Sequence, residues 1–569
     1  MISTEIVSIS GGTNNFIIWV SLIIKKQSIV SYNINVNVEG TSILNKGVNK
    51  NMNLAEALDN TSVTENGMTG FKSAGEAYTD FMYKVSSFRN IHTEEGREAF
   101  VTDLFKSELN KDRSYLLKFI IYLRDPRNGL GERELGRYML SYLFSHYVWD
   151  DKSQTFDFIL KNLFDYGRWD DLFEVFCKEY TEANRLYCSA VFNYCRKVLE
   201  NDLKLAKNNK PVTLLAKWMP SINTSSEETR KLARRIIKTI GWTEKKYRKT
   251  LTYLRDYLKV VEHRMSANEW DKIDYGAVPS LANIRYKDAF MSHDRERRTA
   301  YLKKLSTGEA KINSKVNFPH DVVHAYSSDS WWEVKDYDET LEQLWKNLPE
   351  IKGFENTLVV RDDSGSMTST IGGTRMTALD VATGLGIYCA EHCGDSYKNK
   401  IISFSDNPKY LDFSNKRSLH DKLEYLRLHS EVGCTNIEKV FELILSTAVG
   451  NHLKQGDLPK QIIIISDMEF DEGCNYSRIS NPIEQAQIEF RKYGYQVPRL
   501  IFWNVNGRTN TIPITQNKLG VWLISGFSPR ILDILDIGLE NQEKALLKLL
   551  DKKFKEIPYI ENLSENSLG

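Results

Sequence analysis

The spacing of apolar residues divides the chain into two long parts with different periodicity. From about residue 71 to residue 348, apolar positions recur every three to four residues, which is the period of an amphipathic helix. The clearest such segments are residues 99–109, 115–123, 132–147, 154–164, 169–180, 183–205, 227–240 and 243–263. From residue 356 onward, short runs of β-branched residues replace this pattern, so the fold class changes near residue 350.

The first part is predicted to be an α-helical repeat domain over residues 71–350. Turn residues at 125–129 and the prolines Pro211 and Pro220 separate its helices, and alternating strand patterns are almost absent. Helices joined by short turns favour a HEAT-like solenoid or a ring of helical repeats. Because no fixed repeat period is visible, the solenoid is a hypothesis.

The second part, residues 351–556, is predicted to be a doubly wound, Rossmann-like α/β domain. Apolar runs at 357–360, 400–404, 461–466, 499–505 and 521–525 are predicted strands, and 408–413 is a predicted edge strand. Helices are expected at 378–393, 437–449, 482–493, 529–535 and 541–556. Continuous apolar strands that alternate with helices indicate a parallel sheet covered on both faces.

Both ends of the chain are predicted to lie outside these two domains. Residues 1–70 are rich in Asn, Ser, Thr and Gly and are expected to be a mostly poorly ordered extension with a short strand at most. Its apolar run at 16–24 is too short to cross a membrane, which takes about 20 residues. More typical sequence begins at Met52, so a natural start there, without residues 1–51, is an alternative. Residues 557–569 are predicted to be a polar tail.

Composition narrows the class of protein only slightly. The 76 basic and 75 acidic residues give a net charge of +1, so global charge says nothing about partners. The seven cysteines form no CxxC pair, which argues against a disulfide framework or a zinc site and fits a reducing compartment. We therefore expect a soluble, intracellular, cytoplasmic protein without a membrane partner.

Oxygen-bearing side chains follow two predicted strands and precede one predicted helix. Asp362, Ser364 and Ser366 lie where the first strand ends, and in open α/β sheets this edge is where ligands bind. Thr435, before the helix near 437, and Asp467, after the strand 461–466, are expected at the same edge. Hard oxygen donors of this kind suit Mg²⁺ or Mn²⁺. The alternative is a helix cap or Asx turn that holds no ion.

The spacing and context of these five residues resemble the metal-ion-dependent adhesion site (MIDAS) of von Willebrand factor A domains. The resemblance implies that Ser364 and Ser366 bind a divalent cation directly and that Asp362 and Asp467 act largely through water. It implies that Thr435 binds the cation directly in some states, and that an open coordination position takes an acidic group of a protein partner.

Two departures from the family pattern affect this expectation. Arg361 stands where the family strand has an apolar or small residue, and it either pairs with a carboxylate or competes with the cation. Asp363 adds a second carboxylate that either reaches the ion's outer shell or faces solvent. The acidic residues that follow Asp467 are expected to form a solvated loop, with further ligands as the alternative; they are Glu469, Asp471 and Glu472.

A local excess of basic residues occupies positions 230–264 of the helical part, with aromatic residues between them. Basic side chains neutralise phosphates and aromatic rings stack on unpaired bases, so an RNA-binding surface is predicted here. Its residues are Arg230, Arg234, Arg235, Lys238, Lys245, Lys246, Arg248 and Lys249. A solvated helix face with aromatic residues in the core is the alternative.

Several segments resemble a known pair of domains. The helical (TROVE) module of Ro autoantigen proteins is similar to residues 129–133, 166–172, 245–248 and 278–282. Ro proteins join this module, an RNA-binding ring of helical repeats, to a von Willebrand A domain. Residues 466–470, 503–504 and 525–528 resemble more closely an uncharacterised family of plants and large DNA viruses. The resemblance covers about residues 72–550 and implies binding of small or structured RNA only by analogy.

These observations predict a scaffold protein that is not an enzyme. The sequence has no phosphate-binding loop, nucleophile elbow or HExxH motif. We expect the metal site to bind an acidic group on a protein partner and the helices to bind RNA. A protein-interaction module without RNA binding, and a metal-dependent phosphoesterase, are the alternatives.

Overall fold

The computed structural model describes residues 4–12, 15–22, 59–107, 113–178, 184–314, 316–327, 333–352, 354–394, 396–472, 481–514, 520–537 and 541–565. The chain forms two compact units, Met1–Asp59 and Asn60–Gly569. In the first unit, strands β1 (Thr4–Gly12) and β2 (Asn15–Leu22) pair antiparallel, and most of the expected N-terminal extension lies outside the described residues. All other elements belong to the second unit.

The α/β part of the second unit contains a six-stranded mixed sheet in the spatial order β11-β10-β9-β6-β7-β8. Its strands are β6 (Thr357–Asp362), β7 (Lys400–Phe404), β8 (Lys409–Asp412), β9 (Gln461–Ser466), β10 (Arg499–Asn504) and β11 (Trp522–Ser525). All neighbours run parallel except β8, which pairs antiparallel with β7 at the edge. The strand order reverses at β6, so the gap between β6 and β9 is a topological switch point.

Helices cover both faces of this sheet, as the continuous apolar strands predict. They are α18 (Ala378–His392), α19 (Leu419–His429), α20 (Ile437–Gly450), α21 (Pro482–Lys492) and α22 (Gln542–Lys553). Alternate strand residues enter two separate cores: Val359 and Ile463 pack on the side of α18, and Leu358 and Ile462 on the side of α20 and α21. The sequence did not predict α19, and the helix expected at 529–535 is the 3₁₀ segment η8 (Pro529–Ile537).

The part of the chain before the sheet is helical, as its periodicity predicts. Its helices are α2 (Ala77–Lys84), α3 (Glu94–Ser107), α4 (Leu116–Arg124), α5 (Arg133–His146), α6 (Lys152–Tyr166), α7 (Asp170–Phe176), α8 (Arg185–Lys207), α9 (Leu215–Trp218), α10 (Glu227–Ile240), α11 (Glu244–Tyr257), α12 (Val261–Ser266), α13 (Ser280–Arg285), α14 (Lys287–His293), α15 (Arg295–Ser306), α16 (Pro319–Tyr326) and α17 (Glu339–Lys346). The single helix expected over 243–263 is two, because the chain turns at Lys259 with φ of 50°. Within the described ranges, every helix is too short or too polar to cross a lipid bilayer.

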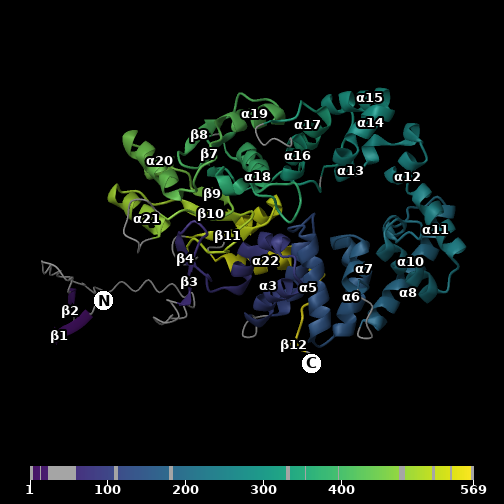
Figure 1. The fold of residues 1–569 in the computed structure, drawn as a ribbon, viewed down its shortest axis with the longest axis horizontal. Helices are drawn as coiled ribbons and strands as arrows, with labels where there is room; N and C mark the ends of the chain where they lie inside the picture. The colour runs from purple at the N-terminus through teal and green to yellow at the C-terminus, as the bar shows by residue number, and fades with distance from the viewer. Residues whose placement is uncertain are drawn as a thin grey trace. The chain divides into compact units, whose positions relative to one another are not determined.

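The helical series touches the α/β part at both of its ends. Helix α2 contacts β10, β11 and α22, whereas α16 packs against α18 and α17 against α19. Figure 1 shows the intervening helices, from α5 through α8 and α11 to α13, bending round between these two contacts. The helices and the sheet therefore form a closed circuit within the second unit.

Two short segments assigned to the chain ends by sequence are part of the folded unit. Strands β3 (Thr61–Val63) and β4 (Thr69–Phe71) form a hairpin, and Phe71 exchanges backbone hydrogen bonds of 2.9 and 2.8 Å with Ile512. In place of a polar tail from residue 557, Ile557 and Ile560 are buried, and β12 (Ser564–Glu565) pairs with β5 (Tyr147–Val148). Apolar contacts hold both segments against the folded unit. The polar residues around them led the sequence pattern to suggest chain ends outside the domains.

A buried ion-pair network is centred on Asp171, which belongs to the segment 166–172 singled out in the sequence. The carboxylate of Asp171 lies 2.7 Å from Arg124 Nη2 and 2.5 Å from Arg137 Nε, and it also accepts the backbone N–H of Arg168 at 2.7 Å. Gly167 is required beside it, because a Cβ there would lie 2.0 Å from the Asp171 carboxylate. The network ties α4, α5 and α7 together.

Replacing Asp171 by Asn is expected to destabilise the protein by about 3 kcal/mol, because Arg124 and Arg137 lose their buried counter-charge. Thermal or urea unfolding followed by circular dichroism measures this. Asp170→Asn is the matched control: Asp170 also pairs with Arg137, at 2.8 Å, but its side chain is 26% exposed, and the expected cost is below about 1 kcal/mol. Equal losses in the two variants would contradict the assignment.

Candidate functional site

Three loops meet at the carboxyl edge of the sheet beside the central strand β6. The loop after β6 carries Asp362, Ser364 and Ser366, and the N–H of Gly365 donates 3.0 Å to the carbonyl of Gly433 in the loop before α20. Asp467 follows β9, which is the parallel neighbour of β6. The structure therefore brings the predicted residues to the switch point of the sheet, where α/β proteins bind ligands.

Four of the five predicted residues form a connected group of oxygen atoms. Asp362 is buried, and its carboxylate accepts the backbone N–H of Ser364 at 2.9 Å and the hydroxyl of Ser466 at 2.5 Å. The hydroxyls of Ser364 and Ser366 lie 3.2 Å apart, and Ser366 also hydrogen-bonds Asp467. Ser366 is half-buried, whereas Asp362, Ser364 and Asp467 are buried, so the group is open to solvent on the side of Ser366.

Thr435, the fifth residue, is buried in the adjoining loop. Its carbonyl accepts the backbone N–H of Asp471 at 3.0 Å, which fixes the loop against the chain that follows Asp467. This hydrogen bond holds Thr435 next to the loop that carries Asp467.

Burial makes the two carboxylates of this group costly to hold as anions. Desolvation, together with the nearby charge of Asp467, raises the pKa of Asp362 to about 8. Desolvation likewise raises the pKa of Asp467 to about 6. Among the described residues, Asp467 Oδ2 has no hydrogen-bond partner. An unpaired buried oxygen beside two hydroxyls and a second carboxylate is a donor set that fits a hard divalent cation.

Arg361 lies on the opposite side of β6 from Asp362. Its Nη2 atom donates to Asp363 at 3.2 Å, Ser403 at 2.9 Å and Ser430 at 2.6 Å. Because successive strand residues point to opposite faces, Arg361 and Asp363 share the α18 side of the sheet. Of the two alternatives for Arg361, the structure shows pairing with a carboxylate.

The expectation of a solvated acidic loop after Asp467 is wrong for Glu469. Glu469 is buried, and its carboxylate accepts the backbone N–H groups of Arg508 at 2.7 Å, Thr509 at 2.8 Å and Glu65 at 2.8 Å. No pattern in the sequence indicated that two distant segments would supply these donors. Glu472, by contrast, is exposed.

Sequence reasoning also missed Arg508, whose Nη2 atom lies 3.6 Å from Asp467 Oδ2. Arg508 belongs to the loop after β10, at the same carboxyl edge of the sheet. Like Asp467, Arg508 follows the end of a predicted strand, so its position could have been selected from the sequence in the same way.

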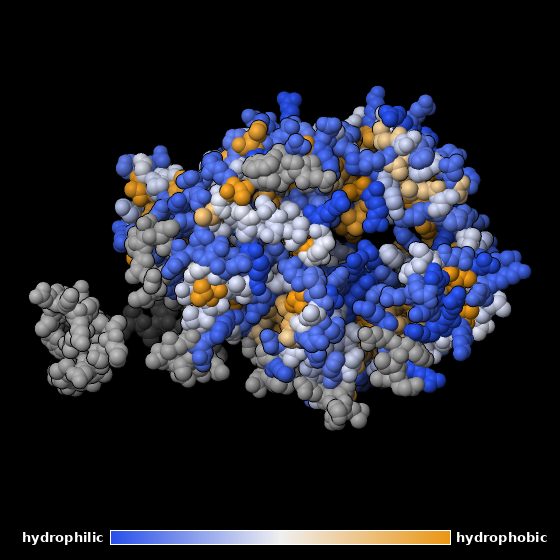
Figure 2. Space-filling view, viewed as in Figure 1, coloured by the Kyte–Doolittle hydropathy of each residue, from blue (hydrophilic) through white to orange (hydrophobic). Residues whose placement is uncertain are grey.

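The helical circuit encloses a second candidate site, a cavity of about 2130 Å³. Its wall includes residues from the loops before α5, α7, α9 and α13 and, from the α/β part, Ile371, Gly372 and Phe527. In Figure 2 the surface is hollowed here, with hydrophilic residues along much of the rim.

Basic residues outnumber acidic ones in the wall of this cavity. The basic residues are Arg89, Arg124, Arg127, Arg133, Arg168, Lys217, Arg255, Lys259, Arg264 and Arg285, and the acidic ones are Glu132, Glu134, Asp165, Glu262, Asp274 and Asp321. Some of these cations are already paired, such as Arg89 with Glu132 at 2.8 Å. Within the described parts of the chain, Arg133, Lys259 and Arg285 make no ion pair. Arg168 lies over the ring of Trp218, at 5.0 Å from its centroid.

The basic residues predicted from positions 230–249 lie on α10 and α11 and not in the cavity wall. Six are exposed: Arg234, Lys238, Lys245, Lys246, Arg248 and Lys249. Arg230 and Arg235 are half-buried, and Arg230 pairs with Glu227. Of the aromatic residues between them, Trp242 and Tyr247 are buried in the core. Three of the cavity cations, Arg255, Lys259 and Arg264, lie within the basic run at 230–264 but were not among the predicted RNA-binding residues. The other cavity cations come from scattered positions and were not predicted.

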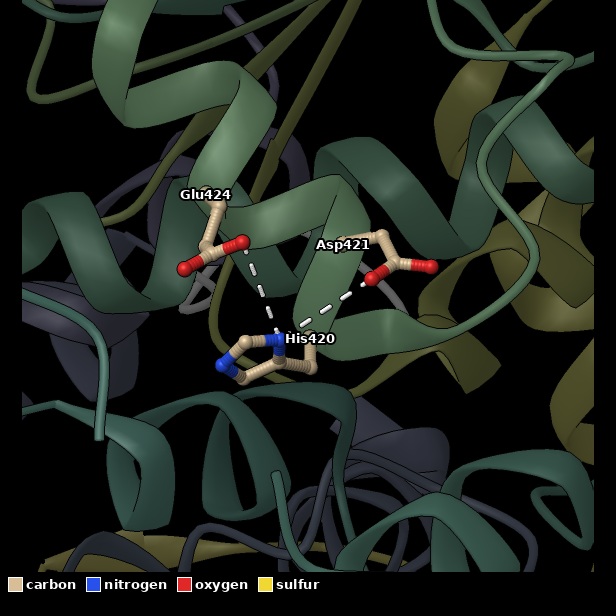
Figure 3. A group of neighbouring side chains, drawn as sticks. All are labelled: His420, Asp421 and Glu424. Carbon is tan, nitrogen blue, oxygen red and sulfur yellow. Dashed lines mark ion pairs between the residues drawn. The ribbon is translucent and has the colours of Figure 1, made fainter. Parts of the chain in front are cut away.

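A third group, His420, Asp421 and Glu424, lies at the start of α19 (Figure 3). The Nδ1 atom of His420 is 4.0 Å from Asp421 and 3.9 Å from Glu424. The carboxylates are 48% and 55% exposed, and Asp421 caps the helix by accepting the N–H of Ser418 at 3.3 Å. Capping accounts for this arrangement, and we assign it no further role.

Two family models match segments of the second unit, and one relative matches most of the chain. Residues 356–557 match the family model "Domain of unknown function (DUF7788)", and residues 174–352 match "Domain of unknown function (DUF2828)". The chain is 29% identical over 541 residues to "Uncharacterized protein L728" of Acanthamoeba polyphaga mimivirus, covering 88% of each chain. This relative supports the expected similarity to a viral type of protein.

Arg361→Met is expected to destabilise the protein by about 3 kcal/mol, because Asp363 is left as an unpaired buried carboxylate. The double variant Arg361→Met, Asp363→Leu is expected to recover at least half of this loss, since both charges disappear together. Urea unfolding compares the two proteins. A double variant less stable than the single variant would show that the pair is not the main interaction of Arg361.

Proposed function

We propose that this protein is a non-enzymatic scaffold that binds an acidic group of a partner protein through a divalent cation. The observation that carries the proposal is the largely buried group of Asp362, Ser364, Ser366 and Asp467, in which one carboxylate oxygen has no hydrogen-bond partner among the described residues. By the von Willebrand A resemblance, the two serines would hold Mg²⁺ or Mn²⁺ directly, the two aspartates largely through water, and Thr435 directly in some states. The cation would supply a positive charge with a free coordination position.

We also propose that the α/β part is a von Willebrand A-type domain and that the helices form a TROVE-like ring of HEAT-like repeats. Support comes from the parallel strands whose carboxyl ends carry the donor residues. It also comes from the helical series, which meets the sheet at both ends and encloses a cavity.

RNA binding by the helices is a second proposed function, and the cavity favours it. Unpaired cations neutralise phosphates, and rings such as Trp218 are suited to stacking on unpaired bases. The exposed cations of α10 and α11 add a second candidate surface. The alternatives remain a module that binds only proteins and a metal-dependent phosphoesterase.

Mg²⁺ is expected to stabilise the protein more at pH 8 than at pH 5. Burial raises the pKa of Asp362 from 3.8 to about 8, so in chelator the folded state binds protons more tightly than the unfolded state does. Stability therefore falls as pH rises between these values, and a cation that replaces the proton offsets this loss. Thermal unfolding with Mg²⁺ or EDTA is expected to show a difference of a few degrees at pH 8 and little at pH 5.

The control for this experiment is Ser364→Ala, which removes one donor hydroxyl and is expected to lose most of the Mg²⁺ effect. An equal Mg²⁺ effect in this variant, or none in the natural protein at either pH, would contradict the metal site.

Binding of a fluorescent single-stranded RNA of about 20 nucleotides is expected to weaken steeply with salt, with a slope near −0.7 for each phosphate contact. Changing Arg133, Lys259 and Arg285 in the cavity to Gln should reduce the slope by about 2. Changing Arg234, Arg235 and Lys238 to Gln is the corresponding test of the outer surface, and the same reduction would show that RNA binds there. Fluorescence anisotropy between about 50 and 200 mM salt measures both. No binding, together with purified protein free of nucleic acid by its absorbance ratio, would favour the protein-only alternative.

A further inference from the structure

Arg508 links the candidate metal site to a segment from the other end of the chain. Its Nη2 atom lies 2.7 Å from Glu65 Oε2 and 3.6 Å from Asp467 Oδ2. Glu65 lies in the turn of the β3–β4 hairpin, some four hundred residues earlier in the sequence. The three side chains form a row of alternating charge that ends at a proposed metal-binding oxygen.

Glu469 fixes the backbone at Glu65 and at Arg508, two of the three residues of this row. Its carboxylate accepts the N–H of Glu65 at 2.8 Å and the N–H of Arg508 at 2.7 Å, and it is itself buried. Two further contacts hold the hairpin: the Thr64 hydroxyl donates 2.6 Å to the carbonyl of Phe470, and Asn66 Nδ2 donates 2.7 Å to the carbonyl of Glu469. The positions of Glu65 and Arg508 beside the site are therefore built into the fold.

The two contacts of Arg508 differ in kind. The distance of 2.7 Å to Glu65 is that of a hydrogen-bonded ion pair, whereas 3.6 Å to Asp467 is beyond hydrogen-bonding distance. Arg508 thus offsets the charge of Asp467 only through space, and Asp467 Oδ2 has no hydrogen-bond donor among the described residues. The Arg508 side chain is also 36% exposed, so it can move away without disturbing the core.

We infer that Arg508 is an internal counter-ion that competes with the divalent cation for Asp467, and that Glu65 limits this competition by pairing with Arg508. The inference rests on the proposed metal site. A fixed positive charge within about 4 Å of a ligand oxygen disfavours a dication there, because the two cations repel each other. Glu65 draws Arg508 away from Asp467, so cation binding and the Glu65 pair support each other.

The test measures Mn²⁺ affinity of the full chain by electron paramagnetic resonance of the free ion. Arg508→Gln is expected to bind Mn²⁺ about tenfold more tightly, the change that corresponds to about 1.4 kcal/mol. Glu65→Gln is expected to bind it about two- to threefold more weakly, because exposed pairs contribute little. Arg508→Lys, which keeps the charge, is expected to stay close to the natural protein.

Lys460→Gln is the matched control. Lys460 is exposed immediately before β9, at the opposite end of the strand that Asp467 follows. The six-residue strand places this charge more than a Debye length of about 10 Å from the site, so its removal should leave Mn²⁺ affinity unchanged.

The outcomes separate the inference from the proposed function. If the natural protein binds Mn²⁺ and Ser364→Ala does not, but Arg508→Gln binds no more tightly, the metal site stands and the counter-ion role is overturned. Weaker binding in both Arg508→Gln and Glu65→Gln also overturns it, since that pattern marks a structural support. Binding that appears only in Arg508→Gln supports the inference, whereas no Mn²⁺ binding in any variant removes both the site and the inference.

Discussion

Two carboxylates are buried at the ends of neighbouring parallel strands, where anions are costly to hold without a counter-charge. Asp362 and Asp467 are both fully buried, and together they would place two negative charges in a region of low dielectric constant. Hydrogen bonds from Ser364 and Ser466 compensate part of this cost at Asp362. At Asp467 the compensation is weaker, because one oxygen has only the distant guanidinium of Arg508. The remaining cost is what a bound cation would remove.

The same sheet also anchors the helices, which connects the two candidate sites. The side chain of Asn504 donates 3.0 Å to the carbonyl of Tyr83, and Ser525 accepts the N–H of Ser86 at 2.8 Å. Residues 503–504 and 525–528, selected in the sequence for a resemblance, thus hold the first helices against the ends of β10 and β11. The loop that leaves the metal group runs on into the cavity wall, where Gly372 donates its N–H to Asn90 at 3.0 Å. The loop after β6 therefore carries donor oxygens at one end and part of the cavity wall at the other.

Sequence patterns predicted the elements well where a single periodicity dominated. The run of isoleucines at 462–465 is buried on both faces of the sheet, so it reads directly as a central parallel strand, and Asp467 follows from it. The contacts that depend on distant segments could not be predicted this way. Glu469 looks like any acidic loop residue until the N–H groups of Glu65 and Arg508 are brought to it. The cavity cations are likewise scattered over the helical part, whereas the local basic run on α10 and α11 drew attention because charge density is visible in sequence.

The unpaired oxygen of Asp467 is better explained by binding than by stability. An Asn at this position would avoid a buried charge, and a Ser or Thr donor nearby would satisfy the oxygen, as Ser466 does for Asp362. An unsatisfied buried polar group costs roughly 1–3 kcal/mol, and functional sites are places where proteins tolerate this cost. A weak internal counter-ion is consistent with this explanation: Arg508 offsets some of the cost while the site is free, yet its separation of 3.6 Å leaves the oxygen open to a stronger cation. The geometry therefore favours reversible occupation over a permanently closed ion pair.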